Sequence, residues 1–282
     1  MSKSQRKRSK RQHVPATLRA LAESDRELGQ IRRGEFPDER FVAFIDILGF
    51  RDILDRMFTN ERELFTTVLE VLEYAKSFAD VPDPENMQAI TAFSDSVVIT
   101  SGGPFGTAGL FATVRALAGE FLTRGILCRG GISRGRMYHA DGILFGEGLV
   151  RAYDLERCMA HTPRILIADD VAPAIYYLIE DPIPRVKRDK DGKLFLNVYN
   201  YFWRNTDISS PDAIVGDRWG GSANEKGLLL ARRGLLDALS RARTMNPPKP
   251  GVLEKVSWSV AQFNDTLQEI RTDAILPIPL DS

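Results

Sequence analysis

The chain of 282 residues is poor in cysteine, with only Cys128 and Cys158. Two cysteines cannot form a disulfide framework or a CxxC…CxxC zinc site, so we expect reduced thiols and a cytoplasmic protein. The sequence also lacks an apolar run of roughly 18 residues or more. Its basic N-terminus lacks the apolar segment of a secretory signal. We therefore expect neither a membrane-spanning helix nor secretion.

Net charge is also absent, because 38 Lys and Arg residues balance 38 Asp and Glu residues. A dedicated nucleic-acid binder would be basic overall, so we expect no nucleic-acid partner. The balance conceals a cationic leader without acids, formed by Lys3, Arg6, Lys7, Arg8, Lys10 and Arg11. Such a leader is typical of a solvated, disordered segment, and contact with an anionic surface is the alternative.

Familiar catalytic signatures are missing as well: there is no HExxH pair, no GxSxG nucleophile elbow and no Walker loop. None of the three histidines, His13, His139 and His161, has paired-ligand spacing, so we expect them to be solvated or hydrogen-bonded. Both cysteines lie in apolar stretches and are predicted to be core thiols.

Changes in composition divide the chain into a basic, partly disordered leader with a polar helix or loop (1–36), a central domain (37–205) and a helical C-terminal extension (206–282). Apolar periodicity in the central domain predicts strands at 41–48, 89–93, 97–100, 127–133, 137–145, 165–168 and 194–203. It predicts helices at 50–57, 61–78, 108–122, 148–158, 171–179, 225–243 and 252–271. We therefore expect an α+β sandwich, with helices on one face of an antiparallel or mixed sheet.

One acid, Asp46, lies inside the nearly continuous apolar run 41–48, which is typical of a central strand. Because a buried carboxylate without a partner is costly, Asp46 must have one. Asp95, at the tip of the predicted 89–100 hairpin, converges with Asp46 if the hairpin lies beside the first strand. Two such carboxylates are typical of a Mg²⁺ or Mn²⁺ site completed by substrate phosphates. The alternative is that Asp46 caps a helix and Asp95 forms an Asx turn.

Four short segments extend this pattern, with the sequences FIDILGF (44–50), FSDS (93–96), RGGISRG (129–135) and LFGEGLVRAYDLE (144–156). Their order and spacing resemble the two metal motifs, the glycine-rich strand and the last strand-to-helix motif of class III nucleotidyl cyclases. The resemblance covers about residues 40–205. It implies a ferredoxin-like class III cyclase sandwich, with 37–205 as the catalytic domain and a helical extension after it.

The resemblance also implies a site. Asp46, Asp95 and the carbonyl of Ile47 would hold two Mg²⁺ or Mn²⁺ ions, which activate the ribose 3′-hydroxyl and hold the triphosphate. The terminal phosphates would lie against the backbone N–H groups of Leu48, Gly49, Phe50 and Arg51. The Phe50 ring could stack on a base, or it could belong to the core. Active sites of this family form between subunits, so a homodimer is implied.

The positions at which this family reads a purine base hold Thr91 and Ile143, and neither residue fits the adenine or guanine pattern. An isoleucine cannot hydrogen-bond a base edge. With RGGI at 129–132 and AYDLE at 152–156, the chain is similar to the pyrimidine cyclases of Pycsar antiphage systems, whose products activate a separate effector protein. The resemblance implies conversion of UTP to cyclic UMP. Alternatives are CTP as substrate, a purine cyclase with an unusual base pocket, and a catalytically degenerate nucleotide-sensing module.

The family's transition-state asparagine and arginine are replaced here by Val150 and Asp154. Charge developing on the α-phosphate still needs a donor. Arg151 is our first candidate and Arg134 our second. The other two arginines of this region, Arg129 and Arg136, could serve the site or form ion pairs at the sheet. Retention of both aspartates argues against a degenerate copy.

Overall fold

The computed structural model describes residues 38–79, 87–103, 105–175, 185–201, 223–270 and 275–280. The chain divides into two compact units, Met1–Pro37 and Asp38–Ser282. The first unit, which holds the predicted leader, lies outside the described residues. So does the predicted domain boundary between residues 205 and 206.

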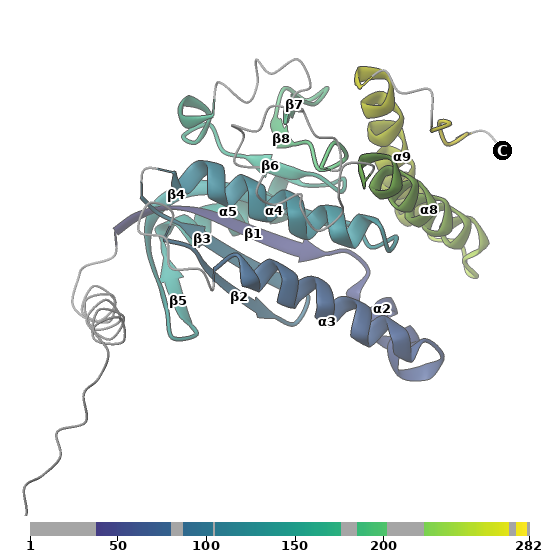
Figure 1. Cartoon of the computed structure of the whole chain (residues 1–282), viewed down its shortest axis with the longest axis horizontal. Coiled ribbons are helices and arrows are strands. Elements are labelled where there is room, and N and C mark those ends of the chain that lie inside the picture. Colours follow the sequence, from purple (N-terminus) through teal and green to yellow (C-terminus); the bar gives the residue numbers. More distant parts are fainter. Residues whose placement is uncertain are drawn as a thin grey trace, which may run out of the picture. The chain divides into compact units, whose positions relative to one another are not determined.

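A mixed sheet organises the described part of the second unit (Figure 1). Its strand order is β2-β3-β1-β4-β6-β8-β7, and β5 pairs with β4 off this path. The strands are β1 (Asp38–Ile47), β2 (Ala89–Phe93), β3 (Ser96–Ser101), β4 (Cys128–Ala140), β5 (Ile143–Gly146), β6 (Ile165–Ile167), β7 (Val186–Arg188) and β8 (Leu194–Leu196). β1 runs antiparallel to both β3 and β4, and β2 runs antiparallel to β3, which is the ferredoxin-like order. The parallel pairing of β4 with β6 makes the sheet mixed. The expected α+β fold is therefore confirmed.

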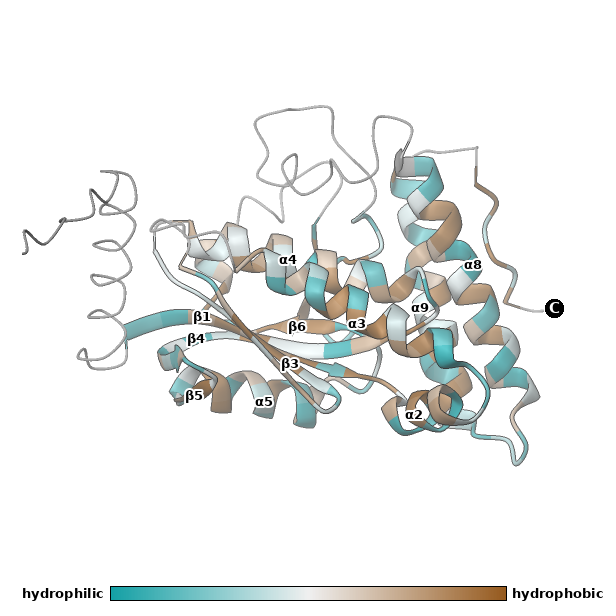
Figure 2. Cartoon of the chain, turned by 60° about the horizontal axis from the view of Figure 1, so that its bottom comes forward, coloured by the Kyte–Doolittle hydropathy of each residue, from teal (hydrophilic) through white to brown (hydrophobic). Residues whose placement is uncertain are grey.

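Helices cover both faces of the sheet, so the prediction of helices on one face was wrong. On one face lie α3 (Arg62–Ser77) and α4 (Gly106–Leu122). The short helix α2 (Phe50–Thr59) connects β1 to α3. On the other face α5 (Glu147–Met159) crosses β1 and β4 (Figure 2). Glycines permit this close approach: a Cβ on Gly131 would lie 2.2 Å from the carbonyl oxygen of Ala152.

The side-chain alternation of β1 explains how one strand serves both layers. Ala43, Ile45 and Ile47 belong to the large core that α3 and α4 share. Val42 and Phe44 belong to the smaller cluster on the α5 side. By the same period of two residues, Asp46 faces α5.

The two predicted C-terminal helices are present as α8 (Ala223–Thr244) and α9 (Pro250–Glu269). They contact each other, and α8 also contacts α4. Gly234 of α8 lies against the turn after α4, where a Cβ would be 2.3 Å from the carbonyl oxygen of Leu122. The buried side chains of α8 and α9, including Leu228, Leu235 and Phe263, belong to the large core, so both helices pack as part of this unit.

Several predicted boundaries differ from the structure. The strands predicted at 127–133 and 137–145 are instead one long strand, β4, and a hairpin return, β5; Asp141 and Gly142 turn the chain with positive φ. β8 ends at Leu196, and within predicted helix 171–179 the structure describes only the 3₁₀ turn η1 (Ala172–Ala174). Cys128 is buried as predicted, but Cys158 is exposed on the outer side of α5.

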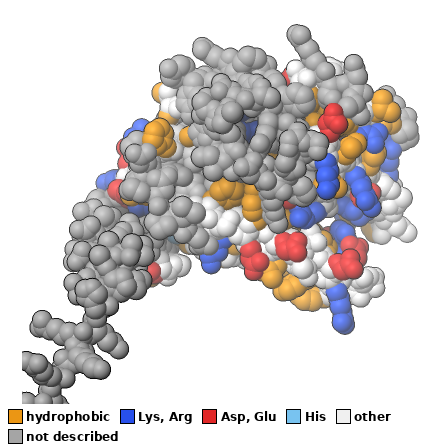
Figure 3. Space-filling view, viewed as in Figure 1, with side chains coloured by type: hydrophobic (Ala, Val, Ile, Leu, Met, Phe, Trp, Pro, Cys, Tyr) orange, Lys and Arg blue, Asp and Glu red, His pale blue; other side chains and the backbone are white. Residues whose placement is uncertain are grey.

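Two features are relevant to nucleic-acid and membrane partners: the distribution of charge on the surface and the apolar length of the helices. On the face shown in Figure 3, basic and acidic side chains of the described residues are mixed, with no extended area of one sign. Within the described ranges, no helix is long and apolar enough to cross a bilayer.

Candidate functional site

The end of β1 brings Asp46 and Asp95 together. In the β1–β3 register Asp46 lies opposite Ser96, the residue after Asp95. The N–H of Ile47 donates to the carbonyl oxygen of Asp95 at 2.8 Å, which holds the hairpin tip beside β1. Ser94, at the tip itself, has a positive φ of 52°. The two aspartates thus come from adjacent elements at one edge of the sandwich.

An arginine from the neighbouring strand partners Asp46. Arg129 of β4 lies opposite Asp46, and its Nε donates to Asp46 Oδ2 at 2.9 Å. The same Nε lies 2.6 Å from Oε1 of Glu156, which is only 4% exposed on α5. Because Nε carries one hydrogen and that hydrogen serves Asp46, Glu156 Oε1 makes an ion pair but no hydrogen bond among the described residues.

Burial governs the ionisation of both acids. Desolvation raises the pKa of Asp46, Arg129 opposes that shift, and the negative charge of Asp95 adds to it. The pKa of Glu156 is likewise raised, mainly by burial, while Arg129 opposes the shift and Asp46 adds to it. Arg129 is therefore the main charge that offsets both acids, with smaller contributions from Lys255 on Asp46 and from Arg157 on Glu156, and further positive charge near Asp46 and Asp95 would be stabilising.

The residues present fit a divalent cation. Asp46 and Asp95 offer hard carboxylate oxygens, which Mg²⁺ and Mn²⁺ prefer, and the mutual repulsion of the two carboxylates would be relieved by a cation. In the part of the chain that the structure describes, no group of three or more His, Cys, Asp or Glu residues could hold a metal. Asp46 and Asp95 would thus give a bound Mg²⁺ or Mn²⁺ two protein carboxylates at most, and the ion would have to complete its shell with other oxygens.

The segment after Asp46 turns sharply into α2. Gly49 takes a left-handed conformation with φ of 72°, and its carbonyl accepts the first helical bond from Ile53 at 3.1 Å. No side chain caps this helix, so the amides of its first turn remain available to an anion. Of the residues predicted to bind metal or phosphate, Ile47, Leu48 and Phe50 pack their side chains against the core, and Arg51 is exposed. The N–H of Leu48 donates to the Leu127 carbonyl at 2.9 Å, so it is not available to a phosphate. For Phe50, the structure favours the core interpretation over base stacking.

Thr91 faces the α5 side of the sheet, where its hydroxyl bonds His139 Nε2 at 2.8 Å. The other ring nitrogen of His139 bonds Thr100 Oγ1 at 2.9 Å. Burial, with a smaller contribution from Arg40, lowers the pKa of His139 to about 4, so the ring is neutral at pH 7. His139 is thus hydrogen-bonded, as the sequence predicts, but its link to Thr91 was not foreseen. Ile143, the other predicted base-pocket residue, is 58% exposed on β5.

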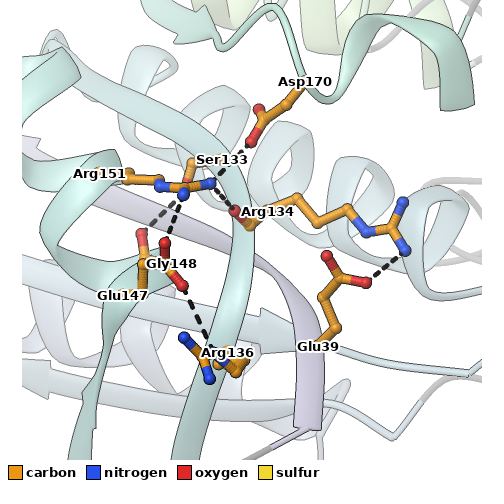
Figure 4. Close-up of polar contacts among 8 residues, drawn as sticks. All are labelled: Glu39, Ser133, Arg134, Arg136, Glu147, Gly148, Arg151 and Asp170. Carbon is orange, nitrogen blue, oxygen red and sulfur yellow. Dashed lines mark hydrogen bonds and ion pairs between the residues drawn. The ribbon is translucent and has the colours of Figure 1, made fainter.

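The remaining predicted arginines pair with acids other than Asp46 and Asp95 (Figure 4). Arg134 pairs with Glu39 at 2.8 Å and stacks over the Phe41 ring. Arg151 pairs with Glu147 and bonds Asp170 Oδ2 at 3.3 Å. Arg134 lies opposite Phe41, which is five residues along β1 from Asp46. About 17 Å of strand therefore separates the position of Arg134 from Asp46.

Arg136 is the other open candidate from the sequence, and its Nε lies 3.6 Å from Glu147 Oε2 at an exposed position. Within one chain, then, the structure brings Arg129 to the aspartates but not Arg134, Arg136 or Arg151. Sequence reasoning missed Glu156; its place one helical turn after Ala152, which packs on β4, was the available signal.

Loss of the shared cation should destabilise the fold. We expect Arg129→Ala to lower the free energy of unfolding by about 3 kcal/mol at pH 8, because it leaves two poorly hydrated acids uncompensated. Adding Glu156→Gln should restore part of that loss. The control, Arg136→Ala, removes an exposed arginine and should change stability by less than about 0.5 kcal/mol. Urea denaturation measures all three variants, and equal effects of Arg129→Ala and Arg136→Ala would contradict the proposed role.

His139 should make the fold sensitive to acid. Its folded pKa of about 4 lies below the ordinary value of 6.5, so the unfolded chain binds the proton first and stability falls as pH drops below about 6.5. We expect a loss of roughly 2 kcal/mol from this residue between pH 7 and pH 4.5. The free energy of unfolding of a His139→Gln variant should differ less between pH 7 and pH 4.5 than that of the wild type. A variant of the exposed His161, His161→Gln, should show the same difference as the wild type. If the stability of His139→Gln fell with pH as steeply as that of the wild type, the role of His139 in acid sensitivity would be refuted.

Comparisons with known proteins give a distant likeness. No protein-family model matches the chain, and no curated protein matches it. Two solved structures of a bacterial light-regulated adenylyl cyclase are similar to it, each with a TM-score of 0.36 and with identities of 14% and 13%. The matched part covers 56% of this chain and 56% of each of those chains, so this chain spans little more than half their length. A likeness at this level establishes neither a shared family nor a shared activity.

Proposed function

We propose that the chain is a metal-dependent nucleotidyl cyclase that converts UTP to 3′,5′-cyclic UMP and pyrophosphate. The observation that carries the proposal is the placement of Asp46 and Asp95 side by side, directly before the uncapped N-terminus of α2. Carboxylates for a metal and amides for phosphates thus meet within a few residues. The sequence motifs that resemble class III cyclases lie in these same elements.

The proposed reaction is an in-line substitution. The ribose 3′-hydroxyl loses its proton to water and its oxygen forms a bond to the α-phosphorus. The bond from the α-phosphorus to the oxygen bridging to the β-phosphate breaks, and pyrophosphate leaves with that electron pair. Two Mg²⁺ or Mn²⁺ ions, when bound, lower the pKa of the 3′-hydroxyl and neutralise the phosphates. Asp46, Asp95 and the Ile47 carbonyl hold the ions. The N–H groups of Gly49, Phe50 and Arg51 bind the leaving phosphates, because that of Leu48 donates to the Leu127 carbonyl at 2.9 Å.

The choice of a pyrimidine base rests on Thr91 and Ile143, which stand at the positions where class III cyclases read a purine. Thr91 carries no charge, and its hydroxyl is engaged by the neutral His139. Ile143 offers no hydrogen bond. These residues supply none of the charged contacts that would select a purine edge, so a smaller base is favoured. UTP is our first candidate and CTP the second, with the cyclic product activating a separate effector protein in antiphage defence.

We further propose a homodimer with its active sites at the subunit interface. The α5 and β5 side exposes large apolar side chains, namely Ile143, Phe145, Val150 and Tyr153. Exposed apolar side chains on one side of a molecule are typical of an interface. A second copy seated there would supply an arginine to the α-phosphate at the first copy's site, with Arg151 as first candidate and Arg134 as second.

The activity is tested with the purified protein, each of the four nucleoside triphosphates and Mn²⁺ or Mg²⁺, with products identified by mass. We expect a cyclic pyrimidine nucleotide, and at least about a 100-fold loss of turnover in Asp46→Asn and Asp95→Asn. The control, Asp141→Asn, changes an exposed turn acid and should keep full turnover, since asparagine tolerates its positive φ. Cyclic AMP or cyclic GMP as the main product would refute the substrate, and nucleotide binding without turnover would refute the activity.

The shared site is tested by mixing two inactive variants. Asp46→Asn and Arg151→Ala should each be inactive alone, whereas a mixture of the two should recover about a quarter of wild-type turnover, because random exchange puts one intact site in half of the dimers. Arg134→Ala replaces Arg151→Ala in a parallel series. No recovery in either series, or full turnover of both arginine variants alone, would contradict the shared site.

A further inference from the structure

A cavity of about 380 Å³ lies between the start of α2, the turn before β4 and the C-terminal helices. Four cations line it: Arg56 from α2, Arg241 from α8, Lys249 at the N-cap of α9, and Lys255 within α9. We call it the cationic cavity. One acid, Asp52, is on its wall, together with the backbone of Leu48 and Gly49. Its size is within the range of small-ligand sites.

Most of this positive charge is not neutralised by the protein. Arg56 is the exception, because it forms a two-pronged pair with Glu61 at 2.7 and 3.0 Å. Arg241 donates to the Gly125 carbonyl at 3.2 Å, and Asp237, Glu61 and Asp52 act on its charge only from beyond ion-pair distance. Among the residues that the structure describes, no carboxylate lies within ion-pair distance of Arg241, Lys249 or Lys255. An anion in the cavity would therefore gain charge-assisted hydrogen bonds without displacing an existing ion pair.

The cations also crowd one another. The pKa of Arg241 is lowered, first by burial and then by the positive charge of Arg56. Like charges held in a partly desolvated cavity are unfavourable for the empty fold, and a multivalent anion relieves the repulsion.

The cavity adjoins the aspartate site. Leu48 and Gly49 form part of its wall, and they follow Asp46 by two and three residues. The positive charge of Lys255 reaches Asp46, whose pKa it lowers. The segment that leads into α2 and the cations of α8 and α9 therefore line a common space, which begins two residues after Asp46.

We propose that the cationic cavity binds a polyphosphate group, and that α8 and α9 thereby form part of the nucleotide site. Its occupant is the terminal phosphates of a nucleoside triphosphate or free pyrophosphate, which share the same chemistry. The identification with the nucleotide rests on the proposed cyclase function. The binding of pyrophosphate itself does not.

The test is calorimetric titration of the full chain with inorganic pyrophosphate, without divalent ions. We expect saturable binding by the wild type and about a 10-fold or greater weakening in Lys255→Ala, as expected for loss of one charge-assisted bond. Lys249→Ala, at an exposed position, should weaken binding with no risk to folding, and Lys255→Arg should retain most of it. The matched control is Arg233→Ala, which removes an exposed cation of α8 outside the cavity.

The outcomes separate this proposal from the cyclase proposal. Pyrophosphate binding that depends on Lys255 and Lys249 supports the cavity site whether or not the protein cyclises a nucleotide. If it does, a raised KM with little change in kcat in Lys249→Ala assigns the site to the substrate's phosphates, and an unchanged KM assigns it to free pyrophosphate. No pyrophosphate binding by the wild type, or equal weakening in Arg233→Ala, would overturn it.

Discussion

The carboxylate of Asp46 imposes the constraint on which the rest of this site depends. It lies near the end of the central strand β1, flanked by core residues, where an uncompensated negative charge is expensive. Arg129 supplies the compensating charge from the adjacent strand, and Glu156 shares that arginine from α5. A strand, its neighbour and the covering helix are therefore linked through one guanidinium. The residual negative charge faces the position where a metal would bind.

The glycines of β4 and α5 make this linkage possible. A side chain on Gly131 or Gly135 would collide with the backbone of α5, and one on Gly148 would collide with Val42. Without side chains at these positions, α5 lies directly on β4 and brings Glu156 down to Arg129. The motifs that resemble a cyclase are thus also the segments that the packing of α5 requires to be small. Site geometry and close packing place the same demand on these positions.

The sequence predicts what depends on local pattern. The apolar run at 41–48, the acid within it, the hairpin with Asp95 and the helices up to α9 all follow from periodicity and turns. Features that depend on tertiary packing were not predictable. α5 lies on the face of the sheet opposite α3 and α4, Cys158 is exposed, and Thr91 bonds a histidine 48 residues away. Arg129 could not be told from Arg134 by sequence, since both lie in one strand. Only the register of β4 against β1 separates them.

The β1–β4 register also determines which residues each copy could contribute to a site in the proposed dimer. In one chain, the aspartates, the α2 amides and the cationic cavity lie at one end of β1, whereas Arg134 lies against Phe41 about 17 Å along the strand. A two-fold axis reverses one copy relative to the other, so each arginine end can meet an aspartate end, and two equivalent sites result. In the proposed dimer, each copy would then hold the metal and the terminal phosphates of its own nucleotide, while its partner would supply charge to the α-phosphate. Phosphate binding would survive in a lone subunit, but turnover would require the pair.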